Sequence, residues 1–366
     1  MNARNKKLIN LFEQKDNNNL NVVDFFCGCG GLSLGFDMAG FNIKAAIDFD
    51  ADSLNTIAHN NLSENPLNID LFEPKWMDKF KSSVDIKNID VIVGGPPCQG
   101  FSLTGTRKLS DKRNELYKAM HDLIKVAKPK AFLIENVKGM ASLYGGAVRD
   151  AVIKDFTELG YTVSSKVVNS KYFGVPQARE RLFYIGLIDK DFVFPDPLFT
   201  EEELVTCREA LDELPSLINL EEISSYRSNP KNQYQQLIRN GAKILKNHQP
   251  TRHTEEVINV ISQVPEGGNH KDLPPGVGDS RKFNEAWTRY DGNKPSRTID
   301  TGHRNHFHYE HNRVPTVREN CRLQSFPDTF EIKGSKTSQN KQVGNAVPVL
   351  LAKVLAEAIY EQIKSR

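Results

Sequence analysis

Hydrophobic and polar residues follow two alternating patterns over the first half of the chain. Short β-branched runs of strand length lie at 21–26, 41–47, 91–95 and 130–136, and stretches with helical spacing separate them at 32–40, 51–60, 114–128 and 146–159. Two more strands are predicted over 161–169 and 181–187. Strands that alternate with helices of these lengths predict an α/β fold built on a parallel, doubly wound, Rossmann-like sheet.

This pattern weakens after about residue 189. Residues 190–312 are rich in Pro, Gly, Asn and His and contain only short periodic pieces such as 254–264, and a strong helical pattern returns over 343–363. A weakly patterned insert of this length is more typical of a second, loop-rich domain than of one structureless loop. We therefore predict one domain from residues 1–189 plus 313–366 and a smaller one at 190–312.

Composition narrows the class of protein. The 366 residues are 39% hydrophobic and 26% charged, as in an ordinary soluble globular protein, and we see no apolar run long enough to span a membrane and no signal-peptide core. The five cysteines lack CxxC pairing, which argues against a disulfide framework or a zinc finger and favours a reduced, cytoplasmic setting. A net charge of +2 is compatible with a nucleic-acid partner but does not require one.

The stretch DFFCGCGG, residues 24–31, runs from a strand into a glycine turn ahead of a helix. Glycines there let a ligand approach the backbone, and Asp48 at the end of the next strand is placed to accept ribose hydroxyls. The glycine spacing differs from GxGxxG, which counts against a dinucleotide cofactor. Together, the glycine turn and Asp48 indicate either a site for a nucleoside cofactor or a plain tight turn.

Two other strand ends carry reactive side chains. In VIVGGPPCQGFS, residues 91–102, glycines and prolines stop a strand sharply and present Cys98 on a stiff backbone, although a free cysteine is most often a small buried hydrophobe. In ENV, residues 135–137, Glu135 ends another apolar strand and alone would be a solvated or capping residue. Because ligands bind at this edge of an α/β sheet, the two could act on one substrate as nucleophile and proton donor.

Basic and histidine-rich segments follow. QARERLF, residues 177–183, is expected to place Gln177, Arg179 and Arg181 on one face of a strand, where two arginines suit a phosphate or carboxylate; a solvated edge strand is the alternative. Seven of the nine histidines lie between His248 and His311. Without a cysteine pair we expect no metal site, and these histidines suit contacts to a nucleic acid better.

Taken together and in this order, the motifs resemble the cytosine-5 DNA methyltransferases, especially the bacterial modification enzymes of restriction systems. The resemblance covers nearly the whole chain, from DFFCGCGG through GGPPCQGFS, ENV and QARERLF to the closing RVPTVRENCRLQSFPDTF and QVGNAVP. Asp48-Phe49 stands where the family often has Glu-Trp, which keeps a carboxylate and an aromatic ring.

The resemblance implies a role for each matched position. Cys98 would attack carbon 6 of a cytosine flipped out of double-stranded DNA, Glu135 would hold its N3 and amino group, and Arg179 and Arg181 would steady the base and its phosphate. The loop from Gln99 through Ser102 to Arg113 would close over the DNA, and 190–312 would recognise a specific site, with Arg297, Arg304 and Asn305 as the first candidates. The cofactor would be S-adenosylmethionine, leaving as S-adenosylhomocysteine, and its expected contacts are Phe26, Gly28, Cys29, Gly30, Asp48, Phe49, Asp70, Leu71, Pro97 and Asn345.

The same resemblance implies a monomer that needs no membrane and can work with a cognate restriction endonuclease without binding it. A tRNA cytosine-5 methyltransferase of the same fold is one alternative. A nicotinamide-dependent Rossmann oxidoreductase is another, but it leaves Cys98 and QARERLF without a role. A DNA-binding module without catalysis is a third, and the intact catalytic motifs argue against it.

Overall fold

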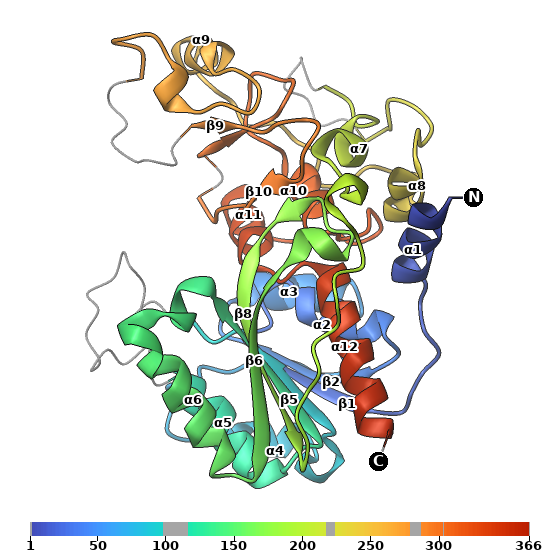
Figure 1. Cartoon of the computed structure of the whole chain (residues 1–366), viewed down its shortest axis with the longest axis vertical. Helices are drawn as coiled ribbons and strands as arrows, with labels where there is room; N and C mark the ends of the chain where they lie inside the picture. The colour runs from blue at the N-terminus through green and yellow to red at the C-terminus, as the bar shows by residue number, and fades with distance from the viewer. Residues whose placement is uncertain (1, 98–115, 217–223, 279–286, 303, 366) are drawn as a thin grey trace. The chain divides into compact units, whose positions relative to one another are not determined.

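The structure is a computed structural model that describes residues 2–97, 116–216, 224–278, 287–302 and 304–365 (Figure 1). Contacts divide the chain into two compact units. The sheet unit comprises Gln14–Asn169, Glu180–Asp196 and Leu351–Arg366, and the second unit comprises Met1–Glu13, Ser170–Arg179 and Pro197–Leu350.

A seven-stranded sheet forms the centre of the sheet unit, with strand order β3-β2-β1-β4-β5-β8-β6. Its strands are β1 (Asn21–Phe25), β2 (Asn42–Asp48), β3 (Pro66–Asn68), β4 (Val91–Gly94), β5 (Ala131–Val137), β6 (Tyr161–Asn169) and β8 (Glu180–Ile188). Pairing is parallel from β3 to β5, whereas β8 is antiparallel to both of its neighbours, β5 and β6. The predicted α/β class and parallel-dominated sheet are confirmed, and the reversed β8 is the departure from an all-parallel sheet.

Helices cover both faces of this sheet (Figure 1). The helices of the sheet unit are α2 (Gly31–Met38), α3 (Ala51–His59), α4 (Trp76–Ser83), α5 (Leu116–Ala127), α6 (Ala147–Thr157) and most of α12 (Val349–Lys364). On one face, Phe80 of α4, Leu123 of α5 and Phe156 of α6 share a buried cluster with Phe25 and Phe132 of the sheet. Burial on both faces explains why β1, β4 and β5 are nearly continuous apolar runs.

Short elements make up the second unit. They are α1 (Ala3–Phe12), α7 (Cys207–Leu211), α8 (Gln233–Arg239), α9 (Glu255–Gln263), α10 (Val317–Leu323), α11 (Lys336–Asn345), β7 (Gln177–Ala178), β9 (Thr288–Arg289), β10 (Ser296–Arg297) and β11 (His306–Phe307). Buried ion pairs connect these pieces: Arg322 contacts Asp328 at 2.6 Å and Glu213 at 2.7 Å, with all three side chains fully buried. Because charged residues occupy interior positions here, the sequence of this unit shows only a weak periodic pattern of hydrophobic residues.

The packing units do not follow the predicted domain boundaries. Residues 313–350 pack with 197–312, because Arg313 bonds to the Ser216 carbonyl and Arg318 to the Lys246 carbonyl. These contacts show which segments pack together, and they do not test the predicted role of residues 190–312 in reading DNA.

Two predicted elements are interrupted. Residues 177–183 form no single strand, because β7 ends at Ala178 and β8 begins at Glu180. The helical stretch at 343–363 breaks after Asn345 and resumes at Val349, next to Pro348, which lacks the N–H that a continuous helix requires. The stretch Lys336–Lys364, which contains both helices, is long and apolar enough to cross a membrane by length and composition alone, but 78% of its most apolar window is buried in the protein, as in the core helix of a globular protein.

Candidate active site at the carboxyl edge of the sheet

Strand register brings the predicted catalytic and cofactor segments to one edge of the sheet unit. Phe25, at the end of β1, pairs with Ile47 of β2 on one side and with Gly94 of β4 on the other. Gly94 in turn pairs with Ile134 of β5. The loops after these four strands therefore leave the sheet at the same edge, where α/β proteins bind their ligands.

The glycine loop after β1 has left-handed backbone conformations at Phe26 (φ 56°), Gly28 (φ 52°) and Gly30 (φ 87°). A Cβ on Gly30 would lie 2.6 Å from terminal methyl carbons of both Ile57 and Leu62, so a side chain there would force these two groups to move. A Cβ on Gly28 would meet no described residue within 4 Å. The left-handed backbone and the neighbouring methyl groups thus both favour glycine at position 30, whereas Gly28 has open space beside it among the described residues.

Asp48 stabilises this loop. Its two carboxylate oxygens accept hydrogen bonds from the backbone N–H groups of Gly28 and Asp50, each at 2.9 Å. Burial raises the pKa of Asp48, and these backbone hydrogen bonds oppose the rise. Each carboxylate oxygen can accept more than one bond, so Asp48 can brace the loop and still receive a ligand hydroxyl.

Aromatic and apolar side chains surround the same edge. Phe49 is 70% exposed, which is unusual for a large hydrophobic residue, while Phe26 and Leu71 are half-buried. Asp70 is exposed, and its Oδ1 accepts the Phe72 N–H at 2.9 Å. Aromatic faces, carboxylates and open space beside Gly28 fit the adenosyl group of S-adenosylmethionine, which combines a flat base with ribose hydroxyls.

Asp24 is a buried acid on β1 that sequence reasoning did not single out. Its Oδ2 accepts hydrogen bonds from the Ser33 hydroxyl at 2.6 Å and the Ser33 N–H at 3.1 Å, which join β1 to the first turn of α2. Burial raises its pKa to about 7. The signal was present as one carboxylate within the apolar run NVVDFF.

Glu135 lies beside the predicted nucleophile segment. Arg181 on β8 holds it through a contact of 3.0 Å between Nε and Oε1, and both side chains are largely buried. A Cβ on Gly95 would lie 3.1 Å from the other Glu135 oxygen, so the backbone of GGPP passes close to the carboxylate. Pro97 is half-buried and described, whereas Cys98, Gln99, Ser102 and Arg113 lie outside the described residues.

Arg179 differs from Arg181 in its surroundings. It belongs to the second unit, is 2% exposed, and donates to the Gly344 carbonyl at 2.9 Å and the Asn345 carbonyl at 3.2 Å. Gln177 is fully buried and bonds to the Leu323 carbonyl. The predicted single face of Gln177, Arg179 and Arg181 is therefore wrong, and the contacts of Arg179 favour a role in holding the QVGNAVP segment over one at the base.

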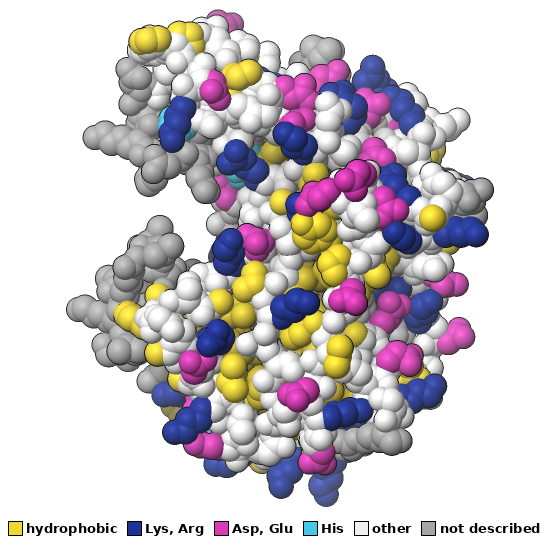
Figure 2. Space-filling model, viewed as in Figure 1, with side chains coloured by type: hydrophobic (Ala, Val, Ile, Leu, Met, Phe, Trp, Pro, Cys, Tyr) yellow, Lys and Arg dark blue, Asp and Glu magenta, His cyan; other side chains and the backbone are white. Residues whose placement is uncertain are grey.

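The candidate DNA-reading residues also lie in the second unit. Arg297 and Arg304 are exposed, and the Asn305 amide donates to Asp300 at 2.5 Å. On the face seen in Figure 2, described Lys and Arg side chains are interspersed with Asp and Glu, in keeping with the small net charge.

Two of the histidines expected to contact nucleic acid are internal. His248 is buried between the Thr316 hydroxyl and the Pro215 carbonyl, and burial lowers its pKa to about 4. His308 is 3% exposed, and burial lowers its pKa as well. The expectation that His248 and His308 reach a ligand is therefore wrong, because both are part of the interior.

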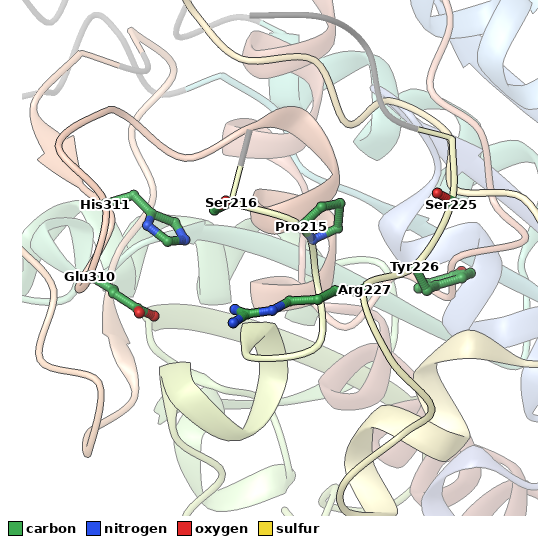
Figure 3. A pocket seen from close by; sticks show the side chains of 7 residues that line it. All are labelled: Pro215, Ser216, Ser225, Tyr226, Arg227, Glu310 and His311. Atoms are coloured by element: carbon green, nitrogen blue, oxygen red, sulfur yellow. The ribbon is translucent and has the colours of Figure 1, made fainter. Parts of the chain in front are cut away.

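A cavity of about 540 Å³ opens elsewhere in the second unit (Figure 3). Arg227 points across it toward Glu310. None of the predicted site residues that the structure describes lines it; the described lining residues are Pro215, Ser216, Ser225, Tyr226, Arg227, Glu310 and His311.

The fold and the carboxyl edge of the sheet unit define an α/β methyltransferase. The family model for the C-5 cytosine-specific DNA methylases matches residues 20–361, and the chain belongs to this family. It is 37% identical over 348 residues to the Type II methyltransferase M1.HphI of Haemophilus parahaemolyticus, covering 93% of this chain and 86% of that relative. It is 34% identical over 369 residues to the Type II methyltransferase M.DdeI of Desulfomicrobium norvegicum, covering 93% and 88%.

Solved methyltransferase structures have the same fold as this chain. A DNA modification methyltransferase encoded within an E. coli prophage superposes with a TM-score of 0.75 at 28% identity, covering 94% of this chain and 99% of that one. The Dnmt2 methyltransferase of S. pombe shares the fold, with a TM-score of 0.60 at 18% identity over 94% of this chain and 99% of that one. The chain is therefore a C-5 cytosine DNA methyltransferase of the Type II restriction–modification kind.

Proposed function

We propose that this protein transfers the methyl group of S-adenosylmethionine to carbon 5 of a cytosine that is flipped out of a specific double-stranded DNA site. The observation that carries the proposal is the Glu135–Arg181 pair, held at the sheet edge beside the Gly95–Pro97 turn that leads directly to Cys98. A cytosine ring inside a duplex is out of reach of such a site, so the base must leave the stack.

The chemistry asked of these residues is covalent catalysis. The Cys98 thiolate adds to carbon 6, forming a C–S bond, while Glu135 holds N3 and supplies a proton to the ring, so that electron density rises at carbon 5. Bound S-adenosylmethionine would supply an electrophilic methyl group to carbon 5, with S-adenosylhomocysteine as the leaving group. N3 then returns its proton to Glu135, a base removes the carbon 5 proton, the C–S bond breaks, and Cys98 leaves as the thiolate.

The remaining residues bind and orient the reactants. Arg181 keeps the Glu135 carboxylate in place through its Nε contact, which limits the geometries from which the proton can be given. Phe26, Gly28, Asp48, Phe49, Asp70 and Leu71 fit the cofactor at the neighbouring strand ends. Residues 190–312 would read the DNA sequence, and the modified site would be protected from a cognate restriction endonuclease in the bacterial cytoplasm.

The test compares wild type with Cys98→Ser on DNA that carries 5-fluorocytosine at the site. Fluorine at carbon 5 blocks the final elimination, so wild type should form a stable covalent complex and Cys98→Ser should form none while still binding DNA. Trapping by the variant, or failure of wild type to trap, would contradict the mechanism. Parallel methylation assays on DNA and tRNA, with bisulfite sequencing of both, distinguish the DNA enzyme from a tRNA methyltransferase.

A further inference from the structure

Two consecutive prolines precede Cys98, and neither Pro96 nor Pro97 has an N–H with which to join the β-ladder. Strand β4 itself is tightly packed at its end: a Cβ on Gly94 would lie 2.6 Å from the Phe25 carbonyl oxygen and 2.9 Å from the Met120 sulfur. The chain therefore leaves a rigid strand and enters a turn whose orientation needs a contact from outside its own backbone.

Asn136 supplies such a contact. Its side-chain Nδ2 donates to the Pro96 carbonyl at 3.3 Å, and its Oδ1 accepts the Val137 N–H at 2.8 Å. The residue is 6% exposed. Both ends of the amide are thus engaged, which defines the orientation of the side chain and the end of strand β5.

We propose that Asn136 is a positioning residue that orients the Pro96–Pro97 turn, and through it the Cys98 nucleophile, relative to Glu135. Asn136 follows Glu135 directly on β5, so one strand end carries both the proton donor and the group that anchors the nucleophile segment. This inference rests on the proposed function, because it assumes that Cys98 attacks the base.

The experiment measures three quantities for Asn136→Ala: single-turnover methylation at saturating cofactor, the rate of covalent trapping on 5-fluorocytosine DNA, and cofactor affinity by calorimetry. Loss of alignment should slow methylation and trapping roughly 10- to 100-fold, the scale of a small misplacement of reacting groups. Cofactor affinity should be unchanged. Trapping at the wild-type rate would overturn the inference.

The matched control is Asn65→Ala. Asn65 also donates from its side chain to a backbone carbonyl, that of Lys44 at 2.9 Å. This contact precedes the paired residues of β2 and β3, so it lies away from the carboxyl ends of the strands, where the candidate active site is. This variant should lose similar stability and keep the wild-type trapping rate; slowing equal to that of Asn136→Ala would show a general structural effect and overturn the inference.

Asn136→Asp carries the test if the alanine variant does not fold. It keeps the side-chain volume and an acceptor for the Val137 N–H, but its ionised carboxylate cannot donate to the Pro96 carbonyl, so trapping should again be slow. Wild-type protein that neither methylates nor traps would refute the proposed function itself. Wild-type protein that traps, together with Asn136 variants that trap equally fast, would refute the positioning role alone.

Discussion

Arg181 and Glu135 meet diagonally across two antiparallel strands, with Nε and Oε1 3.0 Å apart. In the register of β5 and β8, Arg181 is paired with Val137, so its side chain reaches back two residues to Glu135 on the same face of the sheet. The contact orients the carboxylate through Oε1, and the other oxygen, Oε2, lies close to Gly95. The contact fixes the position from which Glu135 would meet N3 of the bound base.

We therefore predict that Glu135→Gln slows single-turnover methylation by about 100-fold or more, the usual scale for a positioned proton donor. Cofactor affinity should be unaffected, since Gln keeps an acceptor for Arg181. The control is Glu180→Gln, which disrupts the exposed pair between Glu180 at the start of β8 and Lys138 directly after β5, and it should leave the rate unchanged. A Glu135→Gln protein that turns over like wild type would show that the carboxylate is structural.

A comparison of two glycine variants separates an effect on cofactor binding from an effect on folding stability. Gly28→Ala places a side chain in the left-handed region at φ 52°, with open space around it, and should cost about 1–2 kcal/mol of folding stability. Gly145→Ala has the same open surroundings at φ 67° and should cost a similar amount. Calorimetry should find weakened S-adenosylmethionine binding in Gly28→Ala alone. Equal affinities in the two variants would mean that the cofactor does not lie against Gly28.

Asp48 is predicted to serve the cofactor twice, as an acceptor for ribose hydroxyls and as the brace of the glycine loop. Asp48→Ala should weaken S-adenosylmethionine binding by about 1.5–3 kcal/mol, the range for hydrogen bonds to a charged group. Asp48→Asn retains one side-chain acceptor and should lose less. Unchanged calorimetric binding in Asp48→Ala would show that Asp48 does not contact the cofactor.

Asp24 predicts a pH dependence of stability. Because burial raises its folded pKa to about 7, the folded protein keeps a proton that the unfolded chain releases near pH 4. The stabilisation is fully present below about pH 4 and is lost as the pH rises through about 7. Asp24→Asn cannot ionise and retains an oxygen for the Ser33 donors.

The difference in unfolding free energy between wild type and Asp24→Asn should therefore fall by about 1–4 kcal/mol from pH 4 to pH 7.5, at about 1.4 kcal/mol per pKa unit. Urea unfolding of both proteins across this range measures it. Parallel stability curves would show that Asp24 has the same pKa in the folded and unfolded protein.

Much of the sheet could be predicted because β-branched runs stop at glycine, proline or polar residues. The strand predicted over 161–169 is β6, and β1, β2, β4 and β5 each end within one residue of the predicted strand ends at 26, 47, 95 and 136. The direction of β8 could not be predicted, because a strand buried on both faces has the same pattern in either direction.

The parts of the site that were missed depend on partners distant in sequence. Asp24 and Asn136 look like ordinary polar residues in apolar strands until folding brings them to Ser33 and to the Pro96 carbonyl. Composition likewise could not show that His248 is buried, since burial depends on the packing of Thr316 and Pro215 around it.

The choice of DNA site provides the last prediction. Arg297 and Arg304 are exposed in the segment that interleaves basic, amide and aromatic side chains, whereas Asn305 is engaged with Asp300. An exposed arginine that reads a base should cost about 1–3 kcal/mol when replaced by alanine and relax one position of the site, while one that contacts phosphate should weaken all DNA alike and reduce the salt dependence. Asn305→Ala should have the smallest direct effect, because its amide already has a partner.

Bisulfite mapping of methylated sites and binding at several salt concentrations, for Arg297→Ala, Arg304→Ala and Asn305→Ala singly, distinguish these outcomes. Arg208→Ala is a suitable control, since Arg208 is also an arginine of the second unit but its guanidinium stacks over Tyr309 and pairs with Glu266. If both exposed arginines keep wild-type site choice and affinity, recognition lies elsewhere in 190–312. A final test exchanges all of 190–312 for the corresponding segment of a relative that methylates a different site. If the exchanged protein keeps its original site choice, residues 190–312 do not read the DNA sequence.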